Sequence, residues 1–296
     1  MTIIFLDIVF QIGEFPASSN DFFASLFISI VGAFAGFMGA YWIYMSSLKK
    51  PRKDTLKYFT ALLESVVSLA RNQAKNVTDL SAKLSGNPTK TALLSIVASH
   101  DIKRLAERVD QQAVYHAYLK EYKRTRDIYR QFKDIYSFVD FIDMSIDELK
   151  KFVEKEYASI YIRKKEYADQ FKIVKQKMQL MIIDPDIAQN YPDYRTGLII
   201  IYDDFHANPI QGENLPRTYT EFIERLKNYI IGYNLVIEAN TNIMLFVNDA
   251  IDSYLSVEQA GLSFAEELKQ FDGTLKAHAD NLEKTISNLK TDFSLA

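Results

Sequence analysis

The chain has 296 residues, of which 48% are hydrophobic, and its formal net charge is −3. The absence of cysteine excludes disulfides, cysteine nucleophiles and thiolate metal sites. Ten glycines and seven prolines are too few for the turns of a β-sandwich or barrel, so the composition favours an all-α fold. The length suits one membrane anchor followed by one or two further domains.

The first 20 residues are apolar and carry only two formal charges, Asp7 and Glu14. A stretch interrupted by Pro16 is too short to span a bilayer, so we predict an interfacial amphipathic segment over residues 1–20. A plug packed on neighbouring helices is the alternative. A cleaved signal peptide is disfavoured because no Lys or Arg precedes the apolar run.

Residues 22–45 carry no formal charge. As a helix they rise by roughly 36 Å, and a bilayer's hydrocarbon core is about 30 Å thick, which predicts a transmembrane helix over residues 21–47. Four basic residues follow within residues 49–53. The positive-inside rule then places the N-terminus outside the inner (cell) membrane and the C-terminal domain in the cytoplasm. A buried core helix is the alternative reading of the same stretch.

One face of this stretch consists of small residues at helical spacing. They are Ser25, Ser29, Gly32, Ala33, Gly36 and Ala40. Small side chains let helices approach closely in lipid, where the hydrophobic effect does not drive pairing, so the face predicts a homo-oligomer such as a tetramer. A ring of these helices would alternatively turn the serines inward and line a pore. The simplest alternative is that glycine and alanine are common in membrane helices.

Residues 51–183 are predicted to form a basic helical cytosolic region. Asp54 is a candidate N-cap, and apolar residues recur after it at helical spacing, which predicts a helix that ends near Leu84. Residues 89–142 contain neither Gly nor Pro and predict one long helix or two in line. Tyrosine recurs there at heptad spacing, which is typical of a coiled-coil-like seam.

The next helix is predicted by the pattern Ser145-x-x-Glu148, which matches a capping box. This helix would extend over about residues 146–183. Because the connection before it is short, it would lie antiparallel to the preceding helix. The run Asp184-Pro185-Asp186 would end it.

Residues 184–217 hold four of the seven prolines and are predicted to be an irregular loop region. The apolar run 197–202 inside it is either a short strand or, as we favour in a helical protein, a helix. Residues 218–296 are predicted to be an acidic C-terminal helical region. One helix is expected over about residues 219–255 and a second after Gly261.

No pattern in the sequence predicts catalysis. It contains no phosphate-binding Gly-rich loop, no Gly-x-Ser-x-Gly and no His-Glu-x-x-His. Asp203-Asp204-Phe205-His206 is the only tight cluster of carboxylates and an imidazole, which would suit a divalent cation or general acid–base work. Such a cluster is more often an exposed helix end, so we predict no enzyme, no cofactor and no metal site.

A run in the basic half of the chain interleaves cations with aromatic rings. It consists of Lys120, Tyr122, Lys123, Arg124, Arg126, Tyr129, Arg130 and Lys133. Cations that track phosphates and rings that stack on bases are typical of single-stranded nucleic-acid binding, so the run predicts a surface for an oligonucleotide or another anionic ligand. Arg163-Lys164-Lys165 would extend this surface. The alternative is packing, because the heptad spacing already explains the tyrosines.

A single span with a small-residue face, followed by a helical cytosolic body without a catalytic motif, resembles the membrane effectors of bacterial anti-phage (abortive-infection) systems. The organisation is similar to that of the effector of the Hailong system, over the whole chain and without a short diagnostic motif. The resemblance implies an oligomeric effector with an ion-conducting pore. Its cytosolic assembly would gate the pore on sensing a nucleotide or oligonucleotide made by a partner enzyme. A membrane-anchored helical scaffold or adaptor without pore activity is the alternative.

Overall fold

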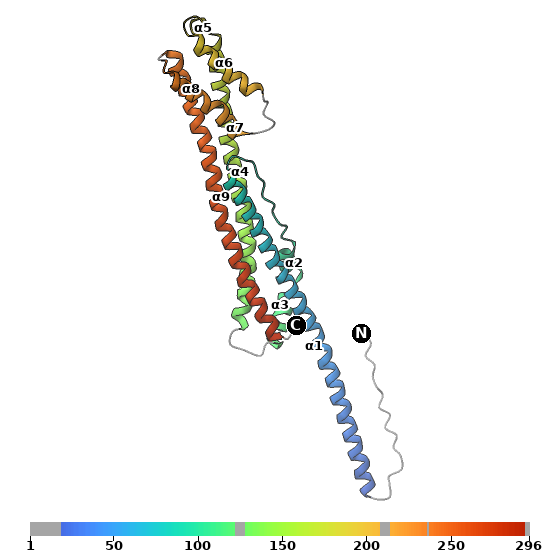
Figure 1. Ribbon diagram of the computed structural model, residues 1–296. Coiled ribbons are helices and arrows are strands. Elements are labelled where there is room, and N and C mark those ends of the chain that lie inside the picture. Colours follow the sequence, from blue (N-terminus) through green and yellow to red (C-terminus); the bar gives the residue numbers. More distant parts are fainter. Residues whose placement is uncertain (1–18, 122–127, 208–213, 236, 294–296) are drawn as a thin grey trace.

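The computed structural model describes residues 19–121, 128–207, 214–235 and 237–293 (Figure 1). No strand occurs within these ranges, which confirms the all-α fold class. The helices are α1 Ser19–Gly86, α2 His100–Arg108, α3 Gln111–Glu121, α4 Ile128–Ile183, α5 Pro185–Asn190, α6 Pro192–Ala207, α7 Leu215–Thr218, the π-helical turn η1 Tyr219–Glu224, α8 Arg225–Tyr233 and α9 Glu238–Phe293. Residues 1–18 of the predicted interfacial segment lie outside the described residues.

The longest helix, α1, has 68 residues and is therefore about 100 Å long. Its second part packs along α9, whereas its first part leaves the bundle and projects away from it (Figure 1). The helix passes through Asp54 without a break, so the helix start predicted there is wrong. An N-cap satisfies the free N–H groups of a first turn, and Asp54 lies in the helix interior, where no such groups remain.

The helices α4 and α9 have 56 residues each and are the other two long elements of the bundle. The hairpin predicted just before Ser145 is wrong, because α4 continues through this point. Ser145 is buried, and so are Ile142, Ile146 and Leu149 around it. Burying one large apolar side chain is worth about 1.5–3 kcal/mol and a helix cap about 1 kcal/mol, so the continuous core face overrides the local capping signal.

The boundaries predicted in the acidic region are also wrong, and for two different reasons. The helix expected over residues 219–255 is divided at Asn234, which adopts a left-handed φ of 51° and lets the chain reverse from α8 into α9. Gly261 lies inside α9 and does not precede a helix. A Cβ atom there would lie 2.1 Å from the Pro88 carbonyl oxygen, so this glycine admits a close backbone contact.

The described part of residues 89–142 forms neither the one long helix nor the two helices in line that were predicted. An extended segment, residues 90–99, which we call the strap, follows α1 and lies along the bundle before α2 and α3 begin (Figure 1). Side chains of the bundle satisfy its backbone in place of helical hydrogen bonds. The buried Gln73, for example, accepts the Val97 N–H at 2.7 Å. The absence of Gly and Pro therefore did not decide the conformation of this segment.

Residues 184–217 are predicted to be irregular, but their described part is mostly helical. Pro185 and Pro192 are the first residues of α5 and α6, where the missing N–H of proline has no intrahelical partner to lose. The Asp184 side chain caps α5, and α4 ends directly before it, as predicted. The helical conformation favoured for residues 197–202 is confirmed.

Two large apolar cores follow one another along the bundle, and a third, small cluster consists of Tyr167, Leu215, Tyr254 and Val257. The larger core is built from α1, α2, α3, α4 and α9. The second is built from α4, α5, α6, η1, α8 and α9, at the end remote from the projecting part of α1, which we call the tip (Figure 1). Because α4 and α9 contribute to both cores, they join the bundle and the tip into one rod.

Candidate functional site: an exposed apolar helix and two apolar grooves

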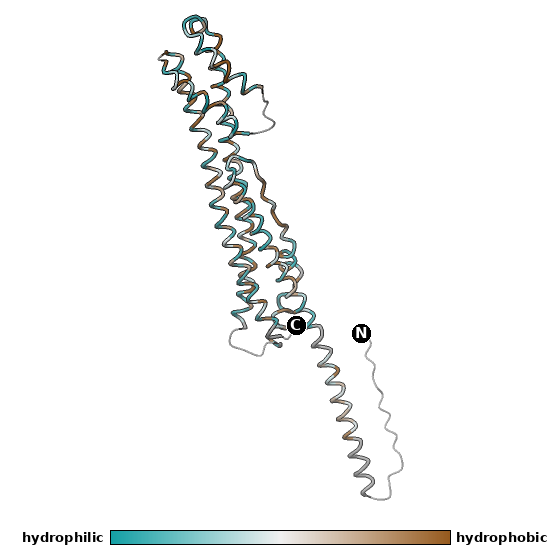
Figure 2. Tube along the Cα trace, viewed as in Figure 1, coloured by the Kyte–Doolittle hydropathy of each residue, from teal (hydrophilic) through white to brown (hydrophobic). Residues whose placement is uncertain are grey.

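The projecting segment, which we define as residues 30–46 of α1, has no buried side chain. Trp42 is 76% exposed, Ile43 73% and Phe37 68%. Figure 2 shows white and brown residues along this part of α1, whereas teal, hydrophilic residues recur throughout the bundle. Uncovered apolar surfaces of this kind mark sites of interaction with proteins or membranes.

The small-residue face of the same helix is open. Its described members, all exposed, are Gly32, Ala33, Gly36 and Ala40. A Cβ atom at either glycine would meet no other atom within 4 Å. Ser25 and Ser29 belong to α1, but their side chains lie outside the described residues. The described part of the face therefore leaves room for the close approach of a second helix.

Across the part of the chain that the structure describes, we find no helix that is both long and apolar enough to cross a membrane. The side chains of residues 19–29 and 47–51 of α1 lie outside that part. The transmembrane helix predicted over residues 21–47 is thus not supported by the described residues.

The structure describes only part of the basic–aromatic run. Tyr122, Lys123, Arg124 and Arg126 lie outside the described residues. The other four are exposed, with Lys120 near the end of α3 and Tyr129, Arg130 and Lys133 on the first turns of α4. These turns lie at the end of the bundle from which α1 projects (Figure 1). The ring of Tyr129 is 71% exposed and is therefore open to stacking.

The other aromatic residues of the predicted seam pack inside an α3–α4 pair. Tyr115 and Tyr118 lie against Phe132, with ring centroids 5.1 and 5.9 Å apart, and Phe132 packs on Tyr136 at 5.0 Å. The Tyr118 hydroxyl donates to a glutamine of α4 at 2.9 Å. The buried Tyr136 hydroxyl has no hydrogen-bond partner among the described residues, and burial raises the pKa of Tyr136 to about 12. Of the heptad tyrosines, Tyr115 and Tyr136 thus pack against Phe132, whereas the ring of Tyr129 is exposed.

The predicted extension of the basic surface to Arg163-Lys164-Lys165 is wrong. It required α4 to be two antiparallel helices, and α4 is one. Lys133 and Lys164 are therefore roughly 45 Å apart along the helix axis. The Arg163 guanidinium donates to the Ser256 hydroxyl on α9, and Lys164 lies in a separate pocket described below.

The carboxylate–imidazole cluster Asp203–His206 lies at the exposed end of α6. Asp204 forms an ion pair with Arg225 at 2.8 Å, and His206 Nδ1 is 2.7 Å from the Tyr202 carbonyl oxygen. Among the described residues, no three His, Asp or Glu side chains are grouped so that they could hold a metal ion. The contacts of this cluster are those of an ion-paired helix end.

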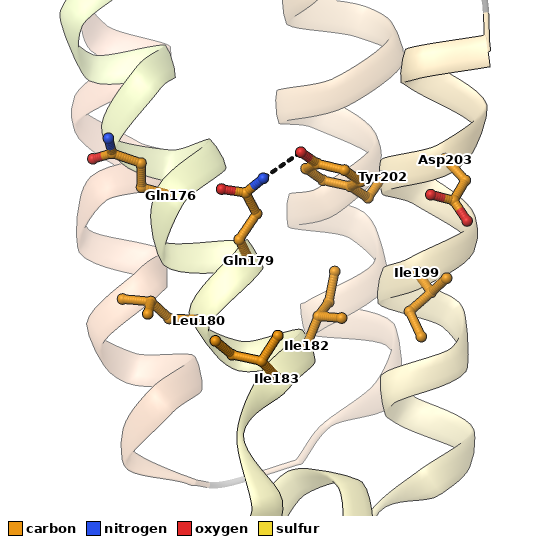
Figure 3. Close-up of a pocket in the computed structure, with 8 residues that line it drawn as sticks. All are labelled: Gln176, Gln179, Leu180, Ile182, Ile183, Ile199, Tyr202 and Asp203. Atoms are coloured by element: carbon orange, nitrogen blue, oxygen red, sulfur yellow. Dashed lines mark hydrogen bonds between the residues drawn. The ribbon is translucent and has the colours of Figure 1, made fainter.

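An apolar groove of about 690 Å³, the tip groove, lies between α4 and α6 (Figure 3). It is lined by Gln176, Gln179, Leu180, Ile182, Ile183, Ile199, Tyr202 and Asp203. Leu180 and Ile183, both from α4, are more than half exposed. The Gln179 amide donates to the Tyr202 hydroxyl across the groove, which ties α4 to α6.

A second pocket, of about 660 Å³, lies under the strap and is called the strap pocket. It is lined by Leu84, Lys90, Thr91, Ala92, Leu93, Tyr157, Ala158, Ile160, Tyr161, Lys164 and Phe264. Lys164 is only 8% exposed, and its Nζ donates to Thr91 Oγ1 at 2.6 Å. The Tyr157 hydroxyl donates to the Ala92 carbonyl and accepts the Leu94 N–H, both at 2.8 Å, so the strap is held firmly against α4.

The sequence alone indicates neither groove, because each forms only when separate elements pack together: α4 with α6 in the tip groove, and α1, the strap, α4 and α9 in the strap pocket. Near the strap pocket, the sequence offers the basic triplet that contains Lys164, and its charge alone suggests the basic–aromatic surface and not a pocket. Comparison of the chain with models of protein families, with curated proteins and with solved structures found no match. The projecting segment, the basic–aromatic run and the two grooves are therefore the features of the molecule that bear on its function.

Proposed function

We propose that the chain is an oligomeric single-span membrane effector. Residues 21–47 would cross the inner membrane with the N-terminus outside, and the bundle would lie in the cytoplasm. The observation that carries this proposal is the projecting segment, an uncovered apolar helix that leaves a well-packed bundle. Removing each large apolar side chain from water is worth about 1.5–3 kcal/mol, so an apolar surrounding stabilises this segment strongly.

The order of residue types along α1 supports a span. Residues 22–45 carry no formal charge and exceed the roughly 20 residues that a spanning helix needs. The exposed rings of Tyr41, Trp42 and Tyr44 stand near the end of this stretch, where aromatic belts meet the membrane interface. Basic residues at 49–53 follow directly. An apolar, aromatic and then basic order is expected where a chain leaves a membrane into the cytoplasm.

The open small-residue face supports self-association. In lipid, helices are held together by close van der Waals contact, and small residues permit the closest approach of two backbones. Among the described residues, no side chain or other element lies within 4 Å of a Cβ atom built at Gly32 or Gly36, so a second copy fits there without displacing the described bundle. The subunit number is set by how these faces pair.

The continuity of α1 supports a gating role for the bundle. One helix of 68 residues carries both the projecting segment and a face of the bundle core, so a shift of the bundle moves the projecting segment. In the proposed effector, this shift opens or closes an ion-conducting pore in anti-phage defence. The trigger would be a nucleotide or oligonucleotide made by a partner enzyme. The exposed Lys120, Tyr129, Arg130 and Lys133 are the described part of its surface, at the end of the bundle from which α1 projects.

Ion flux from liposomes tests the proposal. The full-length chain is expected to release entrapped K⁺ and to migrate as an oligomer after gentle extraction. Gly36→Leu should abolish both, because the added side chain separates the paired helices. Ala35→Leu adds a comparable bulk about 100° around the helix and serves as the matched control. Equal flux from both variants would contradict a close-packed small-residue face.

Salt-dependent binding tests the ligand surface. Arg130→Glu with Lys133→Glu should weaken the binding of a short single-stranded oligonucleotide. It should also reduce the slope of log K against log salt by about 1.4, the value for two lost phosphate contacts. Lys150→Glu, on an exposed turn further along α4, is the control and should leave both unchanged. Unchanged binding by the double variant would exclude this surface.

A membrane-anchored scaffold or adaptor without pore activity is the second candidate. The tip groove favours it, because exposed Leu180 and Ile183 offer an apolar surface at the end remote from the projecting segment. An oligomer that stays in the membrane but conducts no ions under any ligand condition would support the scaffold. Recovery of the full chain from water without detergent would contradict both candidates.

A further inference from the structure

The strap pocket has the dimensions of a small-molecule site. Its volume of about 660 Å³ falls inside the range of roughly 300–1,000 Å³ that is typical of such sites. Its walls come from α1, the strap, α4 and α9. Because Tyr157 and Gln73 hold the strap by hydrogen bonds, the walls are in place before any ligand binds. A preformed pocket loses little conformational entropy on binding.

The lining selects for a molecule that is mostly hydrocarbon. Its polar groups are the Thr91 hydroxyl, the tyrosine hydroxyls and two ammonium groups, and it includes no acidic residue. The rest of the surface is aliphatic or aromatic. A ligand rich in polar atoms, such as a nucleotide, would leave many of them unpaired against this wall, which is costly. An apolar body with one anionic group fits better.

The apolar and cationic parts of the pocket lie at opposite ends of one face of α4. Tyr157, Ile160 and Lys164 recur at helical spacing on this face, and the first and last are about 10 Å apart along the axis. Phe264 packs edge-on against Tyr157, with ring centroids 5.6 Å apart, and closes the apolar end. The contact of Lys164 with Thr91 places a cation at the other end.

Two side chains show what an occupant would contact. The ammonium of Lys164 is nearly buried, so an anion placed beside it interacts through a less polar medium than bulk water. Leu93 lines the pocket and yet is 80% exposed. A hydrocarbon chain laid in the pocket would cover this leucine and bring its own charged head to the lysines.

We propose that the strap pocket binds a single-chain anionic amphiphile. Its carboxylate or phosphate head contacts Lys164, Lys90 and Thr91, and its hydrocarbon chain follows α4 toward Phe264. This inference goes beyond the proposed membrane effector, and neither depends on the other. A free fatty acid and a lysophospholipid share this chemistry and are distinguished by the test.

Photo-crosslinking tests the proposal with the full-length chain in nanodiscs of zwitterionic lipid. A diazirine-bearing dodecanoate is expected to label the peptides that contain Leu93 and Tyr161. Unlabelled dodecanoate should compete for this labelling, and dodecanol, which lacks the anionic head, should not. Competition by lysophosphatidate at a much lower concentration than dodecanoate would assign the head group to a phosphate, and failure of dodecanoate to compete would show that the labelling is non-specific and would overturn the proposal. Equal competition by dodecanol would overturn the proposal.

Charge and volume variants separate binding from folding. Lys164→Met should reduce labelling by about tenfold, the effect of one lost charge-assisted hydrogen bond. Lys90→Met, on the exposed strap, should reduce it without any effect on folding. Ala158→Phe should block it by filling the pocket. Lys165→Met, an exposed neighbour outside the lining, is the control. Labelling that persists in the Lys90 and Ala158 variants with unchanged helicity would overturn the site.

Discussion

The two halves of α1 belong to one continuous helix but bury their residues in opposite ways. Between Leu56 and Leu84, buried residues recur at spacings of three and four, and they lie in the larger core. In the projecting segment, apolar residues occupy every face, small ones on one side and large ones on the others, and none of their side chains is buried. A one-sided apolar stripe can be covered by the chain's own helices, whereas an all-round apolar helix needs a surrounding that the chain does not provide.

The bundle half of α1 also forms exposed ion pairs with α9 beside its buried stripe. Arg71 of α1 bridges Asp280 and Glu283 of α9, at 2.9 and 2.7 Å, and Lys290 pairs with Glu64. These pairs are exposed, and exposed ion pairs add little to stability. The ion pairs fix how α1 and α9 align, and burial of the apolar stripe supplies most of the favourable free energy of folding. The projecting segment has neither a buried stripe nor such ion pairs among its described residues.

The largest expected effect comes from truncating one apolar residue in each half. Leu63→Ala, at a fully buried position, should lower the free energy of unfolding by about 2–5 kcal/mol because it leaves a cavity in the larger core. Phe37→Ala, at an exposed position, should leave this free energy nearly unchanged. Urea unfolding followed by circular dichroism measures both. A large loss in the Phe37 variant would show that the projecting segment packs against the bundle after all.

An intermediate effect is expected where the turn that directly follows α1 meets α9. Gly261→Ala puts a methyl group 2.1 Å from the Pro88 carbonyl oxygen and should destabilise the fold by about 1–3 kcal/mol. Gly273→Ala, on the same helix with open space around it, should stabilise by about 0.5–1 kcal/mol. Thermal unfolding compares the two. If both variants shift stability in the same direction, the contact between α9 and the chain after α1 is not tight.

The smallest effect concerns a tyrosine that packs on the bundle half of α1. Tyr136 lies 6.0 Å from Phe59 of α1, and its buried hydroxyl has no partner among the described residues. Tyr136→Phe should therefore be neutral or stabilise by up to about 1 kcal/mol, whereas Tyr118→Phe loses a hydrogen bond and should cost about 1 kcal/mol. Urea unfolding at pH 7 measures both. A loss in the Tyr136 variant equal to that of Tyr118 would indicate a missed partner.

The same residue predicts an alkaline dependence. Burial raises the pKa of Tyr136 from 10.0 to about 12, so between these values the folded chain binds more protons than the unfolded chain. Stability is then full below pH 10 and falls as the pH rises through this window. Tyr136→Phe should flatten the fall. Unfolding measured from pH 9 to 12 tests this, and an unchanged slope would show that Tyr136 does not titrate in the folded state as described.

Periodicity predicted the helices well but not where they begin and end. The stripe from Leu56 follows from spacing, whereas the endings near Leu84 and before Asp184 follow from the local helix-breaking residues Gly86-Asn87-Pro88 and Asp184-Pro185-Asp186. The capping box at Ser145 and the break expected at Gly261 failed, because these local patterns were outweighed by core burial and by a close backbone contact. Local signals are worth about 1 kcal/mol, which long-range packing exceeds.

The candidate sites also differ in whether near neighbours in the sequence or only the packed structure reveal them. The projecting segment was predictable, because an uninterrupted apolar run is a property of neighbouring residues. The strap pocket was not, since Leu84, Lys164 and Phe264 meet only after α1, α4 and α9 have packed. The sequence shows that cations and rings alternate in the basic–aromatic run, but only the α3–α4 pairing decided which tyrosines pack and which, like Tyr129, stay exposed.

By itself, the sequence determined that this protein is helical, that one stretch is apolar on all sides, and that the chain lacks cysteine chemistry. These are properties of composition and of spacing between near neighbours. Only the tertiary structure decided that α1, α4 and α9 are each continuous, that residues 90–99 are extended, and that two apolar grooves form. The reason is energetic: contacts between segments far apart in the chain outweigh the preferences of any single turn.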